Sequence, residues 1–406
     1  MKKFLKAFGT FALVLLTLTM CGEKTPQPFN PNGSGGSSKP VPKPKPKVEY
    51  EWEKDRKALL KNSDLVLIYG GGDHRNPFEW SQERLTPYVV YKDRGGSSHW
   101  LFDSFLMIEF AGVDKQFCSG YGKKSADKED WKDLLDYYFS KDNQLGALEK
   151  VIDRVAKKIG NPAYKHQIVL TLPEPIVHQD CNNNRSSTRY WGTTTNGKTL
   201  DFSKDVDRVE ACKWYIDYAR KKFSEAGFKH LDLAGFYWVA ETSEHSSTIL
   251  KQISSYLNSM HYSFNWIPYY KSKGHEQWDT FGFNYAYYQP THFFNADVSD
   301  TRLDYACEEA KDCGMYMEME FDGRVLSYNT DNKFDDIHPG GLYSERLRSY
   351  MAAFKRHGFW QNKPLAYYEG GGAIYWMERA TDSRDVALYH DFCEFVVSRP
   401  YHTIGK

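Results

Sequence analysis

Polar and apolar side chains alternate along residues 315–324. Acidic side chains occupy every second position, at Glu318, Glu320 and Asp322, and apolar side chains lie between them. Alternate side chains of an extended strand point to the same side, so this pattern predicts a strand with one acidic side. Because an unpaired buried carboxylate is costly, we expect the strand to open into a polar pocket. The alternative is an edge strand with one face in water.

Short apolar runs that read as strands recur along the chain and alternate with amphipathic segments. We predict eight strands, at residues 65–69, 101–110, 167–172, 230–240, 263–269, 281–287, 315–321 and 364–369. Between them, apolar side chains recur every three or four positions, which is typical of helices packed on one face. We predict helices at residues 128–139, 145–159, 204–226, 246–260, 301–313, 343–357 and 382–397.

The segment 204–226 illustrates the helical pattern. Its apolar face begins at Val206 and ends at Phe223. Ser203 precedes the pattern and is a suitable N-cap, and Gly227 follows it as a stop.

Strands that alternate with helices imply parallel pairing through crossover helices. Eight such units predict an α/β fold, a single (β/α)8 barrel of the TIM type. An open doubly wound sheet is the alternative, but no G-x-G-x-x-G motif follows the first strand. Glycine triplets do follow the first and the eighth strands, at 70–72 and 370–372. In a closed barrel these strands are neighbours, and the triplets would meet on one rim, where glycine lets a ligand approach the backbone.

The N-terminal segment has the pattern of an export signal. A basic start and an apolar run from Phe8 to Met20, too short for a comfortable membrane span, lead to Cys21. This resembles a bacterial lipoprotein signal, which is cleaved before a cysteine that is then lipidated. A secretory signal with an incidental cysteine is the alternative. Residues 21–48 are rich in Pro, Gly, Ser and Lys, which predicts a disordered tether.

We therefore expect a signal peptide at 1–20, a lipidated tether at 21–48 and the barrel at 49–406. The expected location is the cell envelope, on the outer-membrane surface or in the periplasm, with contact to the membrane through the lipid alone. Zero formal net charge and the lack of a basic stripe argue against nucleic acid. The oligomeric state stays open.

Composition points to the ligand class. Aromatic residues make up 16% of the chain, and Trp and Tyr combine a flat apolar face with a polar edge, which suits sugar rings. Beyond Cys21 there are six widely spaced cysteines and no C-x-x-C motif, so we expect at most one disulfide, no metal site and no cofactor.

Acidic residues follow several of the predicted strands. Active sites of barrel enzymes lie at the carboxyl ends of the strands, where we expect Glu174, Glu241, Glu320 and Glu369. No G-x-S-x-G or H-E-x-x-H motif occurs. Paired carboxyl groups among aromatic side chains are typical of glycosidic-bond cleavage. Besides the catalytic pair Glu241 and Glu320, the candidate substrate-binding residues are Glu174, Tyr237, Trp238, Trp266, Tyr269, Tyr285, Tyr288, Glu318, Asp322, Glu369 and Trp376.

The positions of two acids resemble those of the retaining (β/α)8-barrel glycosidases. That clan places its acid/base at the end of strand four and its nucleophile at the end of strand seven, which the resemblance assigns to Glu241 and Glu320. The residue before Glu241 is Ala240, where the clan usually has asparagine. The alternative role for Glu241 is to stabilise the dipole of the helix that follows it.

Three segments also resemble the bacterial family called domain of unknown function 4855. They are Gly235-Phe-Tyr-Trp238 with Glu241, Asn284-Tyr285 with Gln289-Pro290, and Glu318-Met-Glu-Phe-Asp322. Members of the family are exported, and the resemblance implies a barrel in a glycan setting. We therefore expect a glycoside hydrolase acting on a poly- or oligosaccharide. The alternatives are a glycan-binding surface lipoprotein without activity, and a barrel that binds phosphate or sulfate at its glycine-rich rim.

Overall fold

The computed structural model describes residues 48–53, 63–70, 79–112, 115–121, 124–177, 191–327 and 341–405. The predicted signal peptide, the lipidated Cys21 and nearly all of the tether lie outside the described residues. By its internal contacts the chain divides into the units Met1–Val48 and Glu49–Lys406, and the fold below is that of the second unit. No helix among the described residues combines the length and the hydropathy needed to cross a membrane.

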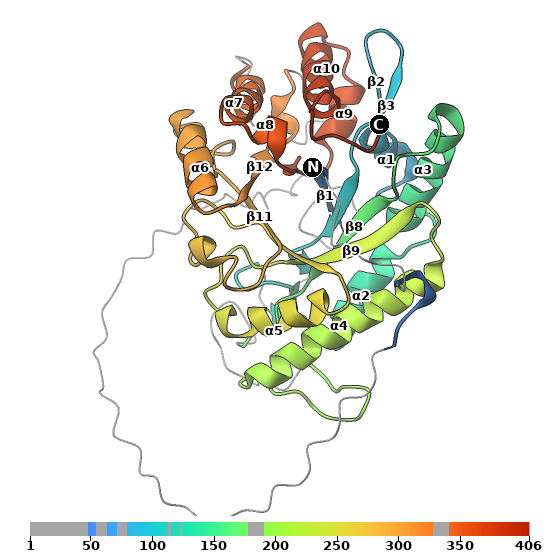
Figure 1. Ribbon diagram of the computed structural model, residues 1–406, viewed down its shortest axis with the longest axis vertical. Helices are drawn as coiled ribbons and strands as arrows, with labels where there is room; N and C mark the ends of the chain where they lie inside the picture. The colour runs from blue at the N-terminus through green and yellow to red at the C-terminus, as the bar shows by residue number, and fades with distance from the viewer. Residues whose placement is uncertain are drawn as a thin grey trace, which may run out of the picture. The chain divides into compact units, whose positions relative to one another are not determined.

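Eight parallel strands close into a barrel, which confirms the predicted fold class (Figure 1). Each strand pairs with the next one along the barrel, and the last pairs with the first. The strands are β1 (Asp64–Tyr69), β4 (Ser104–Ile108), β8 (His166–Leu172), β9 (Leu231–Trp238), β10 (Ser263–Trp266), β11 (Tyr285–Tyr288), β12 (Tyr316–Glu320) and β13 (Leu365–Tyr368). The acidic segment of the sequence analysis is thus the seventh strand of the barrel, and Glu241 follows the fourth.

Helices surround the barrel, and the described residues also form two small sheets outside it. The helices are α1 (Gln82–Val89), α2 (Lys128–Tyr138), α3 (Gln144–Ile159), α4 (Asp205–Ala226), α5 (Ser247–Asn258), α6 (Thr301–Asp312), α7 (Leu342–Arg356), α8 (Phe359–Asn362), α9 (Ala373–Glu378) and α10 (Ser383–Val397). The small sheets pair β2 (Val90–Lys92) with β3 (Ser98–Trp100), and β5 (Ala111–Gly112) and β7 (Lys124–Ser125) with β6 (Lys115–Gln116). Short 3-10 helices lie at η1 (Glu51–Glu53), η2 (His275–Gln277) and η3 (Gly323–Val325).

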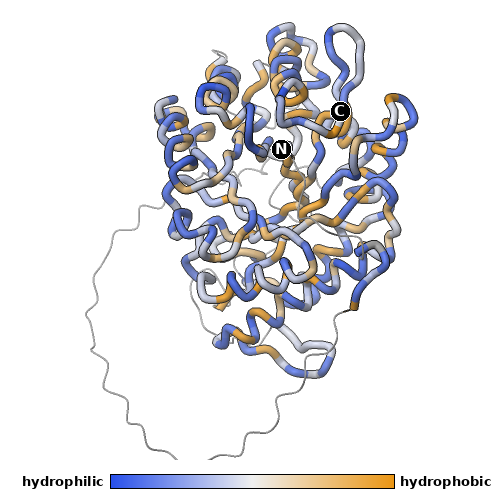
Figure 2. The backbone as a smooth tube through the Cα atoms, viewed as in Figure 1, coloured by the Kyte–Doolittle hydropathy of each residue, from blue (hydrophilic) through white to orange (hydrophobic). Residues whose placement is uncertain are grey.

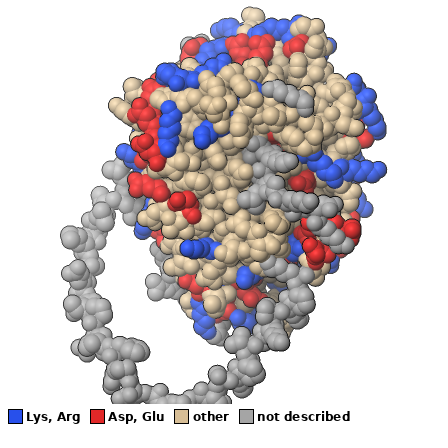
Figure 3. All heavy atoms as spheres, in the orientation of Figure 1, with Lys and Arg blue, Asp and Glu red and all other residues tan. Residues whose placement is uncertain are grey.

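The distribution of hydropathy follows this layering. Figure 2 shows orange, hydrophobic segments along the central strands and mixed colours on the surrounding helices. On the face shown in Figure 3, the described basic and acidic side chains are interspersed rather than gathered in a stripe of one sign. This agrees with the zero net charge of the sequence.

Helix α4 shows how well the apolar pattern predicts an element and where it errs. The helix ends where predicted, at Gly227, whose φ of 61° places it in the left-handed region that favours glycine. It begins after Lys204, because the hydroxyl of Ser203 donates to Asp201 (2.7 Å) instead of capping the helix. Val206, assigned to the apolar face, is 64% exposed because it lies in the first turn, beyond the packed face.

A buried charged network closes the amino-terminal end of the barrel. Asp64, at the start of β1, pairs with Arg399 and accepts hydrogen bonds from Tyr367 (2.6 Å) and His402 (2.8 Å). Burial would raise the pKa of Asp64, but Arg399 and His402 outweigh it, and the pKa lies below its usual value. The network fixes the C-terminal segment to this end, so the open rim is at the opposite ends of the strands.

Candidate active site at the carboxyl ends of the strands

Strand β12 carries two buried carboxyl groups on the same side. Glu318 and Glu320 are 2% and 3% exposed. Their separation by two residues places them on one side of the strand, and Met317 and Met319 point to the other. The strand pairs in register with β13, with Glu320 opposite Tyr368. The alternation therefore produces what the sequence predicted, a strand with an acidic side at the carboxyl end of the barrel.

Glu320 is held by two donors from outside its strand. The hydroxyl of Tyr350, on α7, donates to its Oε2 over 2.7 Å, and the backbone N–H of His292 donates to the same oxygen over 3.4 Å. Burial raises the pKa of Glu320 to about 7, although these hydrogen bonds act in the opposite direction. The group therefore changes its protonation state near neutral pH.

Glu318 differs from Glu320 in having no hydrogen-bond partner among the described residues. Burial raises its pKa well above the usual value, and the charges of Glu320 and Glu241 add to this effect. The protonated form of Glu318 is therefore favoured relative to an exposed glutamate.

Glu241 completes the cluster from the end of β9. Gln289 donates from Nε2 to its Oε1 over 2.8 Å, and Tyr121 donates from its hydroxyl to its Oε2 over 3.1 Å. The ring of Tyr121 is itself fixed by stacking on Phe110 at a centroid distance of 4.5 Å. Helix α5 begins only at Ser247, so Glu241 is not in its first turn and does not have the helix-dipole role.

The three acids form one electrostatic unit, which we call the carboxyl cluster (Glu241, Glu318 and Glu320). The charge of Glu241 raises the pKa of both other members. Repulsion among three neighbouring carboxyl groups favours retention of protons within the cluster, so its members titrate together. A cluster that holds a proton beside a carboxylate can supply the acid and the base that two-carboxylate hydrolysis needs.

One loop contacts both ends of the cluster. The β11–α6 loop (residues 289–300) supplies the side chain of Gln289 to Glu241 and the backbone N–H of His292 to Glu320. Arg346 of α7 holds the loop from behind by donating to the carbonyls of His292, Asn295 (2.9 Å) and Val298 (3.0 Å). The sequence analysis did not predict that this loop contacts the acids. The one feature that could have indicated it was Gln289-Pro290, which is part of the family resemblance.

Glu174 and Asp322 lie at the same end of the barrel but are engaged in local structure. Glu174 accepts from the hydroxyl of Ser246 (2.7 Å) and from the N–H of Ser119 (3.0 Å), which joins two rim segments. Asp322 caps η3 and pairs with Arg324 at 3.0 Å. Both oxygens of each carboxylate are therefore already used by the chain.

Glu369 directly precedes the second glycine triplet, and the backbone of the triplet wraps its carboxyl group. Its carboxyl group accepts from the N–H groups of Gly371 (2.9 Å), Gly372 (2.8 Å) and Ile374 (3.2 Å), and from the hydroxyl of Tyr88 (2.7 Å). Burial raises its pKa to about 7. The donors that an external phosphate would need here are taken by the chain's own carboxyl group.

The glycine triplets meet only in part within the described residues. Strands β1 and β13 are neighbours, as expected. Gly70 is described, and a Cβ there would lie 2.5 Å from the hydroxyl oxygen of Tyr137. Gly71 and Gly72 lie outside the described residues.

Several aromatic candidates have no free face. Trp238 and Trp266 are fully buried, and the ring of Trp266 stacks on Phe283 at 5.0 Å while its N–H donates to Ala240. Tyr288 is buried and donates to Glu309 over 2.8 Å. These rings belong to the packing between strands and helices in this structure.

The remaining aromatic candidates divide between the two ends of the barrel. Burial raises the pKa of Tyr237, and the neighbouring carboxyl groups of Glu241 and Glu318 add to this effect, so the residue adjoins the carboxyl cluster. Tyr269 is 39% exposed on the segment after β10. Trp376 is half-buried on α9, beside Gly372.

Tyr285 is the exception, because it is the first residue of β11. It packs against Tyr316, the first residue of β12, at 5.7 Å. This places it at the amino-terminal end of the barrel, at the opposite end of β11 from Gln289.

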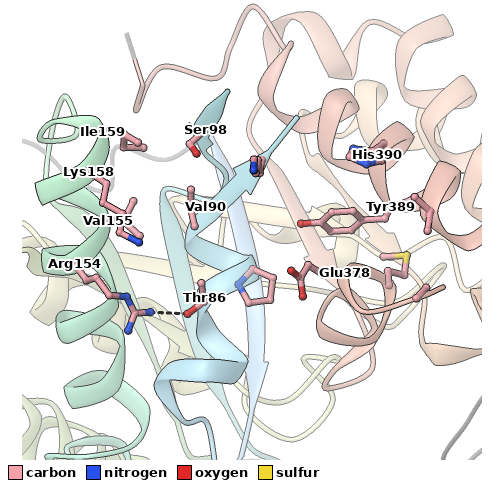
Figure 4. Close-up of a pocket in the computed structure, with 15 residues that line it drawn as sticks. Thr86, Val90, Ser98, Arg154, Val155, Lys158, Ile159, Glu378, Tyr389 and His390 are labelled. Atoms are coloured by element: carbon pink, nitrogen blue, oxygen red, sulfur yellow. Dashed lines mark hydrogen bonds between the residues drawn. The ribbon is translucent and has the colours of Figure 1, made fainter. Parts of the chain in front are cut away.

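A cavity of about 470 Å³ lies apart from the carboxyl cluster (Figure 4). It is bounded by α1, α3, α9, α10 and the β2–β3 hairpin. Its lining includes Val90, Arg154, Lys158, Tyr389 and His390, and contains no member of the cluster. The cavity is therefore not the candidate active site.

One group of described residues has the donor types and the proximity to hold a metal. Ligand atoms of His275, Glu276 and Glu309 lie within 4.8 Å of one another. His275 already uses both ring nitrogens, with the carbonyl of Ser272 (2.7 Å) and with Glu309 (3.0 Å). The described cysteines Cys118, Cys212, Cys307, Cys313 and Cys393 are free thiols. Cys181 lies outside the described residues.

Comparisons with known proteins complete the description. The model of the family described as "Domain of unknown function (DUF4855)" matches residues 64–394. No curated protein matches the sequence. Similar solved structures include a mutant tryptophan synthase α-subunit from the hyperthermophile Pyrococcus furiosus, with 10% identity and a TM-score of 0.35, covering 83% of this chain and 99% of that one.

They also include a fungal β-1,4-galactanase, with 12% identity and a TM-score of 0.36, covering 78% of this chain and 92% of that one. Both TM-scores lie below 0.5.

Proposed function

The chain belongs to the family described as "Domain of unknown function (DUF4855)", and from this premise we propose that it is a glycoside hydrolase acting on a poly- or oligosaccharide. The observation that carries the proposal is that Glu241, after the fourth barrel strand, and Glu320, at the end of the seventh, both accept hydrogen bonds from the β11–α6 loop. A carboxyl group on each side of a sugar at the barrel mouth is the arrangement that cleaves a glycosidic bond.

In the proposed reaction Glu241 is the acid/base and Glu320 the nucleophile or base. In the active protonation state Glu241 carries a proton of the cluster, which it gives to the departing glycosidic oxygen. In one route the Glu320 carboxylate attacks the anomeric carbon, and water deprotonated by Glu241 then hydrolyses the glycosyl ester. In the other route Glu320 takes a proton from the water that attacks the anomeric carbon directly. Tyr350 and the N–H of His292 stabilise Glu320 as a carboxylate. Tyr121 and Gln289 fix the direction of Glu241.

Glu318 has a supporting part in this proposal. Burial and its acidic neighbours raise the pKa of its carboxyl group, which favours the protonated form. A neutral Glu318 limits the negative charge of the cluster, which makes ionisation of Glu320 easier. It also leaves a hydroxyl donor available for a sugar oxygen.

Product formation from a panel of plant, microbial and host glycans tests the proposal. Wild type should cleave one glycan, and Glu241→Gln and Glu320→Gln should each lower the rate by about 10²–10⁴-fold with the fold intact. The matched control is Glu345→Gln, which changes an acid of α7 whose side chain is 72% exposed. Cleavage that survives both active-site changes would overturn the assignment, and glycan binding without any cleavage would favour a binding protein.

We also propose that the protein is a lipoprotein of the bacterial cell envelope. The proposal rests on the basic start, the apolar run and Cys21 of the sequence. Cys21→Ala should move the protein from the membrane fraction to the soluble fraction and abolish labelling with a fatty-acid analogue. Membrane retention of the unlabelled variant would contradict it.

A further inference from the structure

The rim carries an exposed aromatic side chain that the proposed reaction does not use. Phe294 lies in the β11–α6 loop and is 36% exposed. It is the one phenylalanine among the exposed large hydrophobic side chains of the described residues. The exposed third of this apolar ring is a surface on which a ligand can pack.

Phe294 is held in place from several directions. Its ring meets Tyr368, at the end of β13, edge to face at 5.5 Å, and the guanidinium of Arg324 lies 5.1 Å from its centroid. The neighbouring Phe293 contacts it at 5.2 Å. The backbone on both sides is fixed by Arg346, which binds the carbonyls of His292 and Asn295. A ring fixed before binding loses little conformational entropy when a ligand stacks on it.

The loop places this ring beside the carboxyl cluster. Two residues before Phe294, the N–H of His292 donates to Glu320, and Tyr368, on which the ring packs, lies opposite Glu320 in the β12–β13 register. At the start of the same loop, Gln289 donates to Glu241. One continuous segment therefore touches both acids of the proposed catalytic pair and carries the exposed ring.

The charges around the ring select the kind of ligand. Arg324, which lies over the ring, is already paired with Asp322 at 3.0 Å and has no uncompensated charge to offer an anion. The buried acids of the carboxyl cluster oppose a second negative charge nearby. The flat face of an aromatic ring matches the C–H face of a pyranose.

We propose that Phe294 is a stacking platform for a neutral pyranose unit, so that the substrate is an oligosaccharide of at least two sugars, one at the carboxyl cluster and one on this ring. The proposal rests on the glycoside hydrolase function above and deepens it by naming the substrate class and a residue that determines specificity. The sugar on Phe294 extends the contact beyond the bond that is cleaved.

Binding experiments with four neutral hexasaccharides test the platform. The probes are the β-1,4-linked hexamers of glucose, mannose, xylose and galactose. They are titrated calorimetrically into Glu320→Gln and into Glu320→Gln with Phe294→Ala. We expect the second change to weaken binding of the preferred hexamer by about 5–10-fold, and Phe294→Trp to retain it. The matched control is Tyr305→Ala, which removes a 60% exposed ring from α6.

A kinetic readout separates the platform from a merely structural role. In the otherwise wild-type protein, Phe294→Ala should raise KM for the hexamer while the hydrolysis of a glycosyl fluoride of the same sugar, which has no second ring to stack, changes less than about twofold. Equal loss on both substrates would overturn the platform.

The proposed function and the platform can fail independently. Unchanged affinity of Phe294→Ala for a hexamer that wild type cleaves would overturn the platform and leave the hydrolase standing. Weakened affinity in a protein that cleaves no probe would support the platform and count against the hydrolase. Failure of the protein to bind any of the four hexamers would overturn the assignment to neutral pyranose chains.

Discussion

Tyr350 donates a 2.7 Å hydrogen bond to Oε2 of Glu320, although the tyrosine lies on helix α7 and the glutamate on barrel strand β12. Burial, and then the charge of Glu320, raise the pKa of the Tyr350 phenol, so the phenol stays a hydrogen-bond donor at physiological pH. A helix of the outer layer thus controls the ionisation of a group at the barrel mouth.

Tyr350→Phe should shift the pH dependence of the proposed reaction. The hydrogen bond lowers the pKa of Glu320, which burial has raised to about 7. Its removal raises that pKa further, so the ascending limb of kcat/KM should move to higher pH. The pH profile on the cleaved glycan measures the shift. Tyr256→Phe, which removes a phenol bound to Asp217 on the outer helices, is the control and should leave the limb in place.

Glu318→Gln should change how stability depends on pH. The folded-state pKa of Glu318 is raised well above its unfolded value. Its contribution to stability is therefore complete below the unfolded pKa and is lost as the pH rises through the folded pKa. Glutamine does not ionise, so the free energy of unfolding of the variant should rise relative to that of wild type as the pH rises from 5 to 9, by at most about 1.4 kcal/mol per pH unit.

Urea denaturation at pH 5, 7 and 9 measures this difference. Glu345→Gln, on the exposed side of α7, supplies the baseline and should follow wild type at every pH. If the unfolding free energies of Glu318→Gln and wild type also differ by a constant amount at the three pH values, the pKa of Glu318 is not raised by folding. That result would contradict the prediction.

Glu369→Ala should lower the free energy of unfolding and should not remove a group that acts on the substrate. The change removes the acceptor for three N–H groups and for the hydroxyl of Tyr88. Each buried donor left without a partner costs about 1–3 kcal/mol, and water entering the space recovers part of this. We expect a loss of roughly 3 kcal/mol in unfolding free energy by urea titration.

The stability of Tyr88→Phe calibrates this loss, because it removes one of the four donors and leaves the acceptor. It should cost about 1 kcal/mol. A Glu369→Ala protein as stable as wild type but without activity would instead place Glu369 among the groups that act on the substrate.

The buried pair at the closed end of the barrel should behave as a unit. Arg399→Met leaves Asp64 charged and buried, and should cost about 3–5 kcal/mol. Asp64→Asn combined with Arg399→Met removes both charges and should recover part of that loss. Chemical denaturation of both single variants and the double variant gives the coupling energy. Additive losses would show that the two side chains do not stabilise each other.

The strands could be predicted because their chemistry is local. Apolar runs of four to eight residues between turn residues mark strands wherever they occur, and eight of them implied a closed barrel. The order of the strands then followed from the rule that parallel neighbours are joined by helices. The positions of Glu241 and Glu320 at the carboxyl ends followed from the strand count alone.

The partners of these acids could not be predicted, because they come from distant parts of the chain. Tyr121 and Tyr350 reach the cluster from a loop after the second barrel strand and from the seventh helix. Nothing in their local sequence distinguishes them from other tyrosines, of which the chain has 29. Such contacts depend on tertiary packing.

A second feature that the sequence could not predict was the side of the barrel strand to which a given side chain points. Both faces of these strands are buried and apolar, so the direction of Trp238 and Trp266 cannot be read from their spacing. Tyr285 shows a third limit, the strand boundary. A strand was predicted at 281–287, but Gly282, with a φ of 90°, lies in a turn and β11 begins only at Tyr285.

Arg346 fixes the path of the β11–α6 loop through three main-chain carbonyls. The carbonyl group is the same in every amino acid, so the course of the loop does not depend on which side chains it carries. Substitutions at the positions between His292 and Val298, in nature or in a randomised library, can therefore change sugar specificity while the backbone contact to Glu320 is kept.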